Sequence, residues 1–308
     1  MTEAALSDAA LPDAAVGGTS WHGRATLHPA GSGRKRARRA NLLTYTVLIV
    51  VAAIILVPLV ATALGGFKTL GGLRANPFGL PTEWIWSNYW DILASARYWH
   101  MLGNSLIIAT LTVSLVLATA SMAAFTFAHL RFFGSGFLLN YFLIGLMFPA
   151  ATAILPIFIR IRDLGLLDSY FGVVLPQAAF GLGLSVPLMR NYFKSMPHEL
   201  FDAAFVDGCG YAQYFWHVTL PLARPILATV GTVSFVSSWN NYLLPLILLN
   251  TETRYPWPLG IMVYQGEFGT DWQLILAFVT LTILPTIIVF FAAQKHIVAG
   301  LTSGAVKG

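Results

Sequence analysis

The stretch ELFDAAFVDGCGYAQYFWHVTLPLARP, residues 199–225, decides how the rest of the chain must fold. Its polar side chains are too numerous for a segment that crosses a bilayer, and its aromatic rings are too numerous for a loop that only connects two segments. We therefore expect it to join two membrane segments and to place one of its faces against a protein or a membrane surface.

The chain on either side of this stretch has the composition of a membrane protein. Its 308 residues are 56% hydrophobic and 10% charged, and the mean hydropathy is +0.69. A helix needs about 20 apolar residues to cross a hydrocarbon core of about 30 Å. Six windows without Asp, Glu, Lys or Arg reach that length. They cover residues 40–67, 101–128, 132–159, 169–189, 225–251 and 272–294. These windows predict an all-α polytopic membrane protein with six transmembrane helices.

The distribution of basic residues predicts that both termini are cytoplasmic. In that orientation twelve of the 18 Lys and Arg residues lie inside and six lie outside, in agreement with the positive-inside rule. The run RKRARR at residues 34–39 supplies much of the excess. We expect a disordered basic cytoplasmic tail (1–40), because its first 33 residues lack an apolar period, then a six-helix membrane domain (41–298) and a C-terminal cytoplasmic tail (299–308).

The first half of residues 199–225 has the signals of a short helix. Pro197 suits a first helical turn because its missing N–H costs nothing there, and Glu199 suits the positive helix N-terminus. The helix is predicted to begin near Met196. Asp207 and Gly208 form a turn pair that ends it, since glycine tolerates left-handed geometry.

The second half predicts another helix that Pro221 stops. Its rings fall at helical spacing and form one aromatic face. The members of that face are Tyr211, Tyr214, Phe215 and Val218. From the residues alone two interpretations stay open, a docking surface for a partner protein and a helical hairpin packed on its own protein.

This hairpin resembles the cytoplasmic "EAA" loop of the permease subunits of type I ABC importers, where Glu-Ala-Ala is followed by Asp-Gly and then by Leu-Pro. The matching residues are Glu199, Asp202, Ala203, Ala204, Asp207, Gly208, Leu220, Pro221 and Pro225. Asp202 stands where the motif has Glu, and Cys209 stands where it has Ala. The shorter Asp side chain keeps the charge but weakens or lengthens an ion pair with a partner.

The C-terminal sequence QKHIVAGLTSGAVKG, residues 294–308, is similar to the tail of MalG-like carbohydrate permeases. Together the two resemblances cover all six windows and leave out the first forty residues. They imply the type I ABC importer transmembrane-domain fold in a bacterial plasma membrane. They also imply that residues 196–225 form the EAA loop with its coupling helix, which enters a cleft of a cytoplasmic ATPase subunit.

The resemblance implies a role for each matched position. The coupling residues are Glu199, Asp202, Ala203, Ala204, Asp207, Gly208, Tyr211, Phe215 and Pro221. Glu199 and Asp202 would pair with basic groups of the ATPase, the small residues would allow close approach, and the rings of Tyr211 and Phe215 would pack. The C-terminal tail would contact the ATPase through Gly300, Gly304 and Lys307.

The implied partners are a MalF-like second permease, a dimer of ATPase subunits, an extracytoplasmic solute-binding protein and membrane lipid. This chain has no G-x-x-x-x-G-K-[ST] phosphate loop, so ATP and Mg would be bound by the ATPase and this chain would hold no cofactor. It would not be an enzyme. Its basic residues flank the apolar windows, an arrangement that does not predict nucleic-acid binding.

Polar residues within the fifth window are candidates for a solute pathway, because intramembrane polar groups face protein, water or ligand. The candidates are Ser234, Ser237, Ser238, Trp239, Asn240 and Asn241. Ser234, Ser237 and Asn241 share one helix face at i, i+3 and i+7. Interhelical hydrogen bonds are the alternative for the serines, and an interfacial position is the alternative to sugar stacking for Trp239.

The absence of charge from all six windows separates the candidate functions. An ion-coupled secondary carrier usually needs an intramembrane acid, and a glycerol-phosphate-type substrate would need a cation in its path. A membrane enzyme would need a nucleophile with a base or a metal, whereas the single cysteine and the histidines form no catalytic or metal-binding set. The pattern favours a di- or oligosaccharide or a related polyol, with a secondary carrier as the rival.

Overall fold

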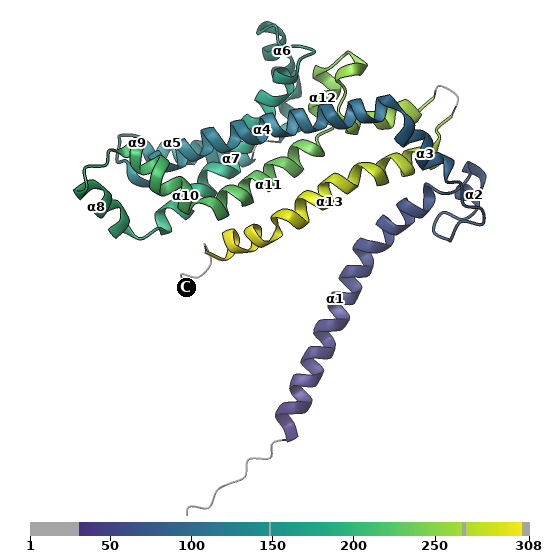
Figure 1. The fold of residues 1–308 in the computed structure, drawn as a ribbon, viewed down its shortest axis with the longest axis horizontal. Helices are drawn as coiled ribbons and strands as arrows, with labels where there is room; N and C mark the ends of the chain where they lie inside the picture. The colour runs from purple at the N-terminus through teal and green to yellow at the C-terminus, as the bar shows by residue number, and fades with distance from the viewer. Residues whose placement is uncertain (1–30, 148, 267–268, 304–308) are drawn as a thin grey trace, which may run out of the picture. The chain divides into compact units, whose positions relative to one another are not determined.

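A computed structural model describes residues 31–147, 149–266 and 269–303. Within these ranges the chain consists of helices, short helical turns, irregular connections and one isolated β-bridge between Gln265 and Thr270. Figure 1 shows the helices in chain order. The predicted all-α fold class is confirmed.

The chain divides into two compact units, residues 1–55 and 56–308. Helix α1 (Gly31–Gly65) begins in the first unit and ends in the second. Its side chains at residues 44–60 are exposed, and the helix is long and apolar enough from Thr44 onward to cross a membrane. Such a surface suits contact with lipid. Residues 31–40 of the predicted tail belong to α1, and residues 1–30 lie outside the described residues.

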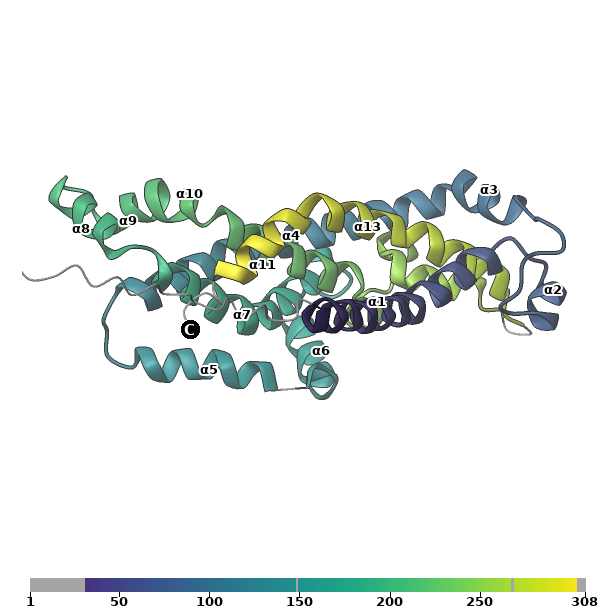
Figure 2. The same cartoon turned by 90° about the horizontal axis from the view of Figure 1, so that it is seen from below.

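Four long helices pack together in the second unit: α4 (Ala96–His129), α7 (Tyr170–Ser195), α11 (Arg224–Trp239) and α13 (Trp272–Ser303). Figures 1 and 2 both show them side by side. Ala120 and Ala124 on α4 are completely buried beside Met189 and Phe193 of α7. Small residues on one helix allow the close approach that packs membrane helices together.

The predicted third membrane helix, residues 132–159, is broken. Helix α5 (Ser135–Met147) is followed by a 3-10 turn, η1 (Ala150–Ala153), and by α6 (Ile154–Asp163). The two parts meet at an angle of 97°. Pro149 precedes η1 in an extended conformation, and a proline can neither donate a backbone hydrogen bond nor let the preceding residue stay helical without strain.

The predicted fifth helix, residues 225–251, is also interrupted. Helix α11 ends at Trp239, and a separate short helix, α12 (Leu243–Leu248), follows. The Asn240 side chain donates to the carbonyl of Val236 at 2.9 Å, and the Asn241 side chain accepts from the N–H of Leu244 at 3.1 Å. Asparagine amides compete with the helical backbone in this way, so the adjacent pair forms a break.

The number of membrane spans depends on how these bent segments are counted. Among the described residues α1, α4, α7 and α13 are each long and apolar enough to span by themselves. Two bent pairs add to them, α5 with α6 and the helix over Tyr211–Leu222 with α11. The count is six if each bent pair forms one span.

The chain after α12 folds back across the bundle through two 3-10 segments, η3 (Glu252–Arg254) and η4 (Trp257–Tyr264). Side chains of α4 hold this irregular backbone. Asn104 donates to the carbonyls of Thr253 and Tyr255 at 2.8 and 3.0 Å, and Ser105 Oγ accepts from the Trp257 N–H at 2.8 Å. Backbone that is neither helix nor sheet needs such partners inside an apolar bundle.

The connection from α1 to α4 contains α2 (Leu70–Ala75) and α3 (Ser87–Ala94) and is built around a buried cation. Lys68 is only 3% exposed, and its ammonium donates to the carbonyls of Asn76 at 2.7 Å and Gly79 at 2.6 Å. The carbonyl oxygens replace the water that this charge loses on burial. Helix α3 carries two aromatic residues of this connection, Tyr89 and Trp90.

Asp168 joins the α6–α7 turn to the segment after α12. Its backbone is left-handed, with φ 53°, and its Oδ1 accepts from the N–H groups of Asn250 and Thr251, both at 3.0 Å. Its Oδ2 accepts from the Thr251 hydroxyl at 2.6 Å and from Arg254 at 3.0 Å. The Thr251 hydroxyl is the main cause that lowers the pKa of Asp168 from 3.8 to about 2. Desolvation raises this pKa, whereas the two N–H groups and Arg254 lower it further.

This lowered pKa predicts an acid-sensitive connection. Because folding favours the Asp168 carboxylate, its contribution to stability is complete above about pH 4 and is lost as the pH falls toward about 2. The melting temperatures of the native protein and of Asp168→Ala should therefore differ most near neutral pH and converge on acidification. Thermal unfolding in detergent across this range measures the difference.

Asp163→Ala is the control, since it removes only an exposed pair with the neighbouring Arg162. Exposed pairs contribute little to stability, so it should leave the melting temperature nearly unchanged. A gap between native protein and Asp168→Ala that widened on acidification would contradict the role assigned to the carboxylate.

Candidate functional site

Residues 198–222 form the predicted helix–turn–helix hairpin at one end of the bundle (Figure 1). Helix α8 (His198–Val206) begins directly after Pro197, close to the predicted start. Gly208 follows with φ +84°, the left-handed conformation expected of a glycine that ends a helix. The second helix comprises α9 (Tyr211–Tyr214), a π-helical turn, η2 (Phe215–Thr219), and α10 (Leu220–Leu222).

Pro221 does not stop this second helix, which corrects the sequence prediction. It lies in the first turn of α10, where a proline needs no partner for an N–H. The π-helical turn before it also shifts the hydrogen bonding, so that the N–H of Leu220 bonds to the carbonyl of Phe215. The direction changes two residues after Pro221, at Ala223, where the helix that ends at Leu222 meets α11 at 76°.

Most of the predicted coupling residues lie on the outer face of the hairpin. The exposed ones are Glu199, Asp202, Ala203, Asp207, Gly208, Tyr211 and Pro221. Ala204 is half-buried. Asp202 already has a partner in this chain, because its carboxylate lies 3.3 Å from Nδ1 of His198 one helical turn earlier.

The inner face of the hairpin packs on the bundle. Tyr214 and Phe215 are 1% and 6% exposed, and the ring of Phe215 lies 5.1 Å from that of Phe125 on α4. The ring of Phe201 stacks on His129 at 5.3 Å. The predicted contact of Phe215 with a partner is therefore corrected, because its side chain belongs to the internal core. The interpretation as a hairpin packed on its own protein is confirmed for this inner face, and the docking interpretation stays a prediction for the exposed face.

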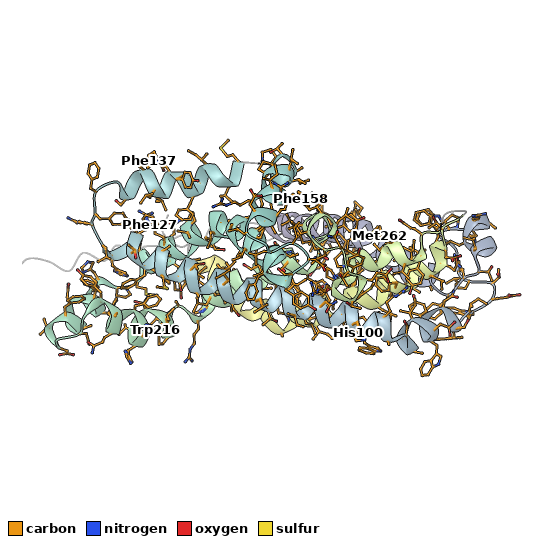
Figure 3. The ribbon with its side chains drawn as sticks, turned by 90° about the horizontal axis from the view of Figure 1, so that it is seen from above. His100, Phe127, Phe137, Phe158, Trp216 and Met262 are labelled. Carbon is orange, nitrogen blue, oxygen red and sulfur yellow. The ribbon has the colours of Figure 1, made fainter. Side chains whose placement is uncertain are left out.

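Four large exposed apolar side chains on the hairpin were not among the predicted coupling residues. Val206 is 87% exposed, Trp216 is 64% exposed, Leu222 is 46% exposed and Leu200 is 40% exposed. Figure 3 shows Trp216 at the outer edge of this end of the molecule. Periodicity gave no signal for them, because a partner-facing apolar residue looks the same in sequence as one that faces the core.

Of the three residues predicted to form the C-terminal contact, Gly300, Gly304 and Lys307, the structure describes only Gly300. Gly300 belongs to α13, which extends to Ser303. Gly304 and Lys307 lie outside the described residues.

A cavity of about 380 Å³ lies between α4, α7, α11 and the α5–η1–α6 break. Of the predicted pathway residues it brings together Ser234, Ser237, Ser238 and Asn241. Its described lining residues include no charged residue. The two breaks in the third and fifth predicted helices both border it, since Ala150 and Leu243 are among its lining residues.

Gln177 of α7 is the polar centre of this cavity. Its Oε1 accepts from the hydroxyls of Ser238 at 2.6 Å and Thr112 at 3.2 Å. Its Nε2 is buried and has no hydrogen-bond partner among the described residues. If the amide is turned over, the two hydroxyls accept and the oxygen is the end without a partner. In either orientation one strong hydrogen-bonding group of Gln177 has no partner among the described residues.

Two of the predicted pathway residues do not line the cavity. Trp239 is 1% exposed, stacks on Phe235 at 5.4 Å and donates to the Thr282 carbonyl at 3.3 Å. It cannot stack on a solute without leaving the core, so its predicted role is corrected. Asn240 is exposed but is absent from the lining. Its amide donates to a backbone carbonyl in the last turn of α11.

The chain offers no metal centre in its described part, where no three His, Cys, Asp or Glu side chains are grouped to hold an ion.

Residues 116–303 match the family described as "Binding-protein-dependent transport system inner membrane component". The matched residues include the whole hairpin and most of the cavity lining. The chain belongs to this family. The predicted resemblance to the permease subunits of ABC importers is thereby confirmed.

Individual relatives of this inner membrane component agree with the family match. It is 29% identical over 272 residues to "Diacetylchitobiose uptake system permease protein NgcG" of Streptomyces coelicolor, covering 88% of this chain and 90% of that protein. It is 34% identical over 231 residues to "Trehalose transport system permease protein SugB" of Mycobacterium tuberculosis, covering 74% and 84%.

A solved structure shares the fold of this inner membrane component. One chain of a bacterial ABC transporter involved in the import of the acidic polysaccharide alginate superposes with a TM-score of 0.72 at 26% identity. The match covers 84% of this chain and 96% of that chain.

The turn of the hairpin should depend on Gly208 in this inner membrane component. A Cβ there meets no neighbour, but φ +84° costs a non-glycine residue about 1–2 kcal/mol. In Gly208→Ala we expect about 5- to 30-fold faster hydrogen exchange at the Cys209 N–H, which bonds to the Ala204 carbonyl at 2.9 Å. Gly210→Ala is the control, since φ there is −78° and a Cβ also meets no neighbour. Equal exchange rates in both variants would disprove this role of the turn.

Proposed function

We propose that this chain is the permease subunit of an ATP-driven importer that carries a neutral di- or oligosaccharide, with the hairpin as its contact to the ATPase. The observation that carries the proposal is the uncharged cavity around Gln177, which the α5–α6 and α11–α12 breaks border. The two relatives named for diacetylchitobiose and trehalose, and the neighbour named for alginate, support a carbohydrate as the solute class.

The chemistry of the cavity fits a sugar. Serine hydroxyls and Asn and Gln amides both donate and accept, so they can replace the water around sugar hydroxyls one for one. The apolar part of the lining includes Phe180, Leu146 and Val116, which can cover the C–H faces of a sugar ring. A glycerol-phosphate-type solute fits this cavity less well, because its described lining residues include no cation to pair with the phosphate charge.

The outer face of the hairpin fits the predicted contact with an ATPase. Exposed acids, Glu199 and Asp207, lie on the same hairpin as the exposed apolar side chain of Val206, and a protein interface typically combines an apolar centre with a polar rim. The inner face couples this surface to α4 and α7 through Tyr214 and Phe201. A displacement of the hairpin would therefore move the helices that line the cavity.

The complete transporter, on this proposal, contains a MalF-like second permease, an ATPase dimer that binds ATP and Mg, and an extracytoplasmic solute-binding protein. The family's description as binding-protein-dependent supports dependence on a binding protein. Both termini and the hairpin are cytoplasmic in this arrangement, as the distribution of Lys and Arg predicts. Energy for transport comes from the ATPase, and this chain contributes no catalytic residue.

The coupling proposal predicts that Asp207→Arg abolishes ATP-driven uptake into vesicles that contain the assembled transporter. Reversing this exposed charge places a repulsive group in the interface while leaving the six-span bundle intact. Glu83→Arg, an exposed charge reversal at the other end of the bundle, is the control and should keep uptake near the native level. Uptake that proceeds without ATP in the native protein would support a secondary carrier instead.

The solute proposal predicts that Gln177→Leu raises the apparent KM for sugar uptake by about 3- to 10-fold. This range corresponds to the loss of one hydrogen bond of about 0.5–1.5 kcal/mol. Thr119→Val is the matched control, since Thr119 donates to its own helix at Leu115 and does not line the cavity. An unchanged KM in Gln177→Leu, at equal amounts of assembled transporter, would remove Gln177 from the pathway.

A further inference from the structure

A second polar cavity, of about 430 Å³, lies where α4 and α7 end beside the start of α8. Its lining includes three cations, Arg131, Arg190 and Lys194, together with the imidazoles of His129 and His198. Phe127, which Figure 3 labels at this end of the bundle, is one of its apolar residues. The coupling hairpin and the transport cavity do not account for this basic cavity.

The positive charge of the basic cavity is not neutralised by the described part of the chain. No Asp or Glu lines it, and the nearby Asp202 is paired with His198. Arg190 uses its Nε to donate to the Phe127 carbonyl at 3.2 Å, and its terminal amino groups have no described acceptor. The side chains of Arg131 and Lys194 likewise make no hydrogen bond to a described residue. Three like charges that share one cavity favour the binding of an anion.

We infer that the basic cavity binds the phosphate group of an anionic phospholipid. It lies at the ends of two membrane-crossing helices, which is the level of the lipid head groups. Its lining also includes the apolar residues Phe127 and Phe132, which suit the glycerol and upper acyl region better than a freely dissolved ion. An arginine with free amino groups supplies the planar donor pair that phosphate oxygens accept.

A bound lipid would connect the hairpin to the bundle. His198 and Phe201 of α8 line the same cavity as Arg131 beyond α4 and Arg190 of α7. His129, whose Nε2 is buried without a partner among the described residues, stacks on Phe201 at this junction. Phosphate binding would hold α8 against α4 and α7, so anionic lipid should increase ATP-driven uptake. This effect on transport rests on the proposed function, whereas lipid binding does not.

The test uses the assembled transporter in nanodiscs of phosphatidylcholine with or without phosphatidylglycerol. Mass spectrometry of the intact complex without ATP counts the phosphatidylglycerol molecules retained. We expect Lys194→Gln to weaken retention about 5-fold, the effect of one cation near a charged membrane surface, and Lys194→Arg to restore it. Arg224→Gln removes an exposed cation at the same end of the bundle but outside the cavity, so it should retain lipid like the native protein.

Three results would overturn the inference. Equal retention by Lys194→Gln and Arg224→Gln would mean that net charge, and not the cavity, binds lipid. Inorganic phosphate that displaces phosphatidylglycerol from the native complex would identify a site for free phosphate. Loss of the ATPase from Lys194→Gln with unchanged lipid retention would assign the cavity to an acidic partner. Uptake that fails in every lipid while retention follows the prediction would count against the proposed function alone.

Discussion

The rest of the structure depends on one constraint, that polar groups inside an apolar bundle must find partners within the protein. The irregular segment after α12 can lie against α4 only because Asn104 and Ser105 provide the hydrogen bonds that water would otherwise supply. The buried ammonium of Lys68 donates to backbone carbonyls of the connection before α3 in the same way. At the surface, Asp168 accepts from two backbone N–H groups and holds the turn before α7. These side chains hold the connections between the helices in place.

The two candidate binding regions occur where this pairing is incomplete. Among the described residues, Gln177 has one amide end without a partner beside the uncharged cavity, and three cations share the basic cavity without an acid. An unpaired polar group is costly in an apolar environment unless a ligand completes it. The hairpin adds a third incomplete surface, which differs from the first two because its exposed side chains, such as Val206 and Trp216, are apolar. Solute, lipid and partner protein would each complete one of these surfaces.

Sequence reasoning predicted the helix ends well, because residues close in the chain determine them. It predicted the surroundings of individual side chains poorly, because contacts between distant segments determine those. Pro197 and Gly208 mark the ends of α8 correctly, because helix termini follow from the residues at the ends. The placement of Trp239 was wrong, because a Trp near a membrane surface and a Trp in a core have the same local pattern. The interruption at Asn240 and Asn241 was missed because charge-free windows record hydropathy and not competition for the backbone.

The sequence by itself determined the class of the protein, the approximate extent of its apolar segments, and the helix–turn–helix of residues 199–225 with its family. These follow from hydropathy, helix-end chemistry and motif spacing, which act between residues close in the chain. Only the tertiary structure decided that Phe215 faces inward while Val206 faces outward. It also placed Gln177 in the lining of the uncharged cavity. In the same way it brought Arg131, Arg190 and Lys194 to one basic cavity. The physical reason is that these arrangements join side chains from helices far apart in sequence, and packing alone brings such residues together.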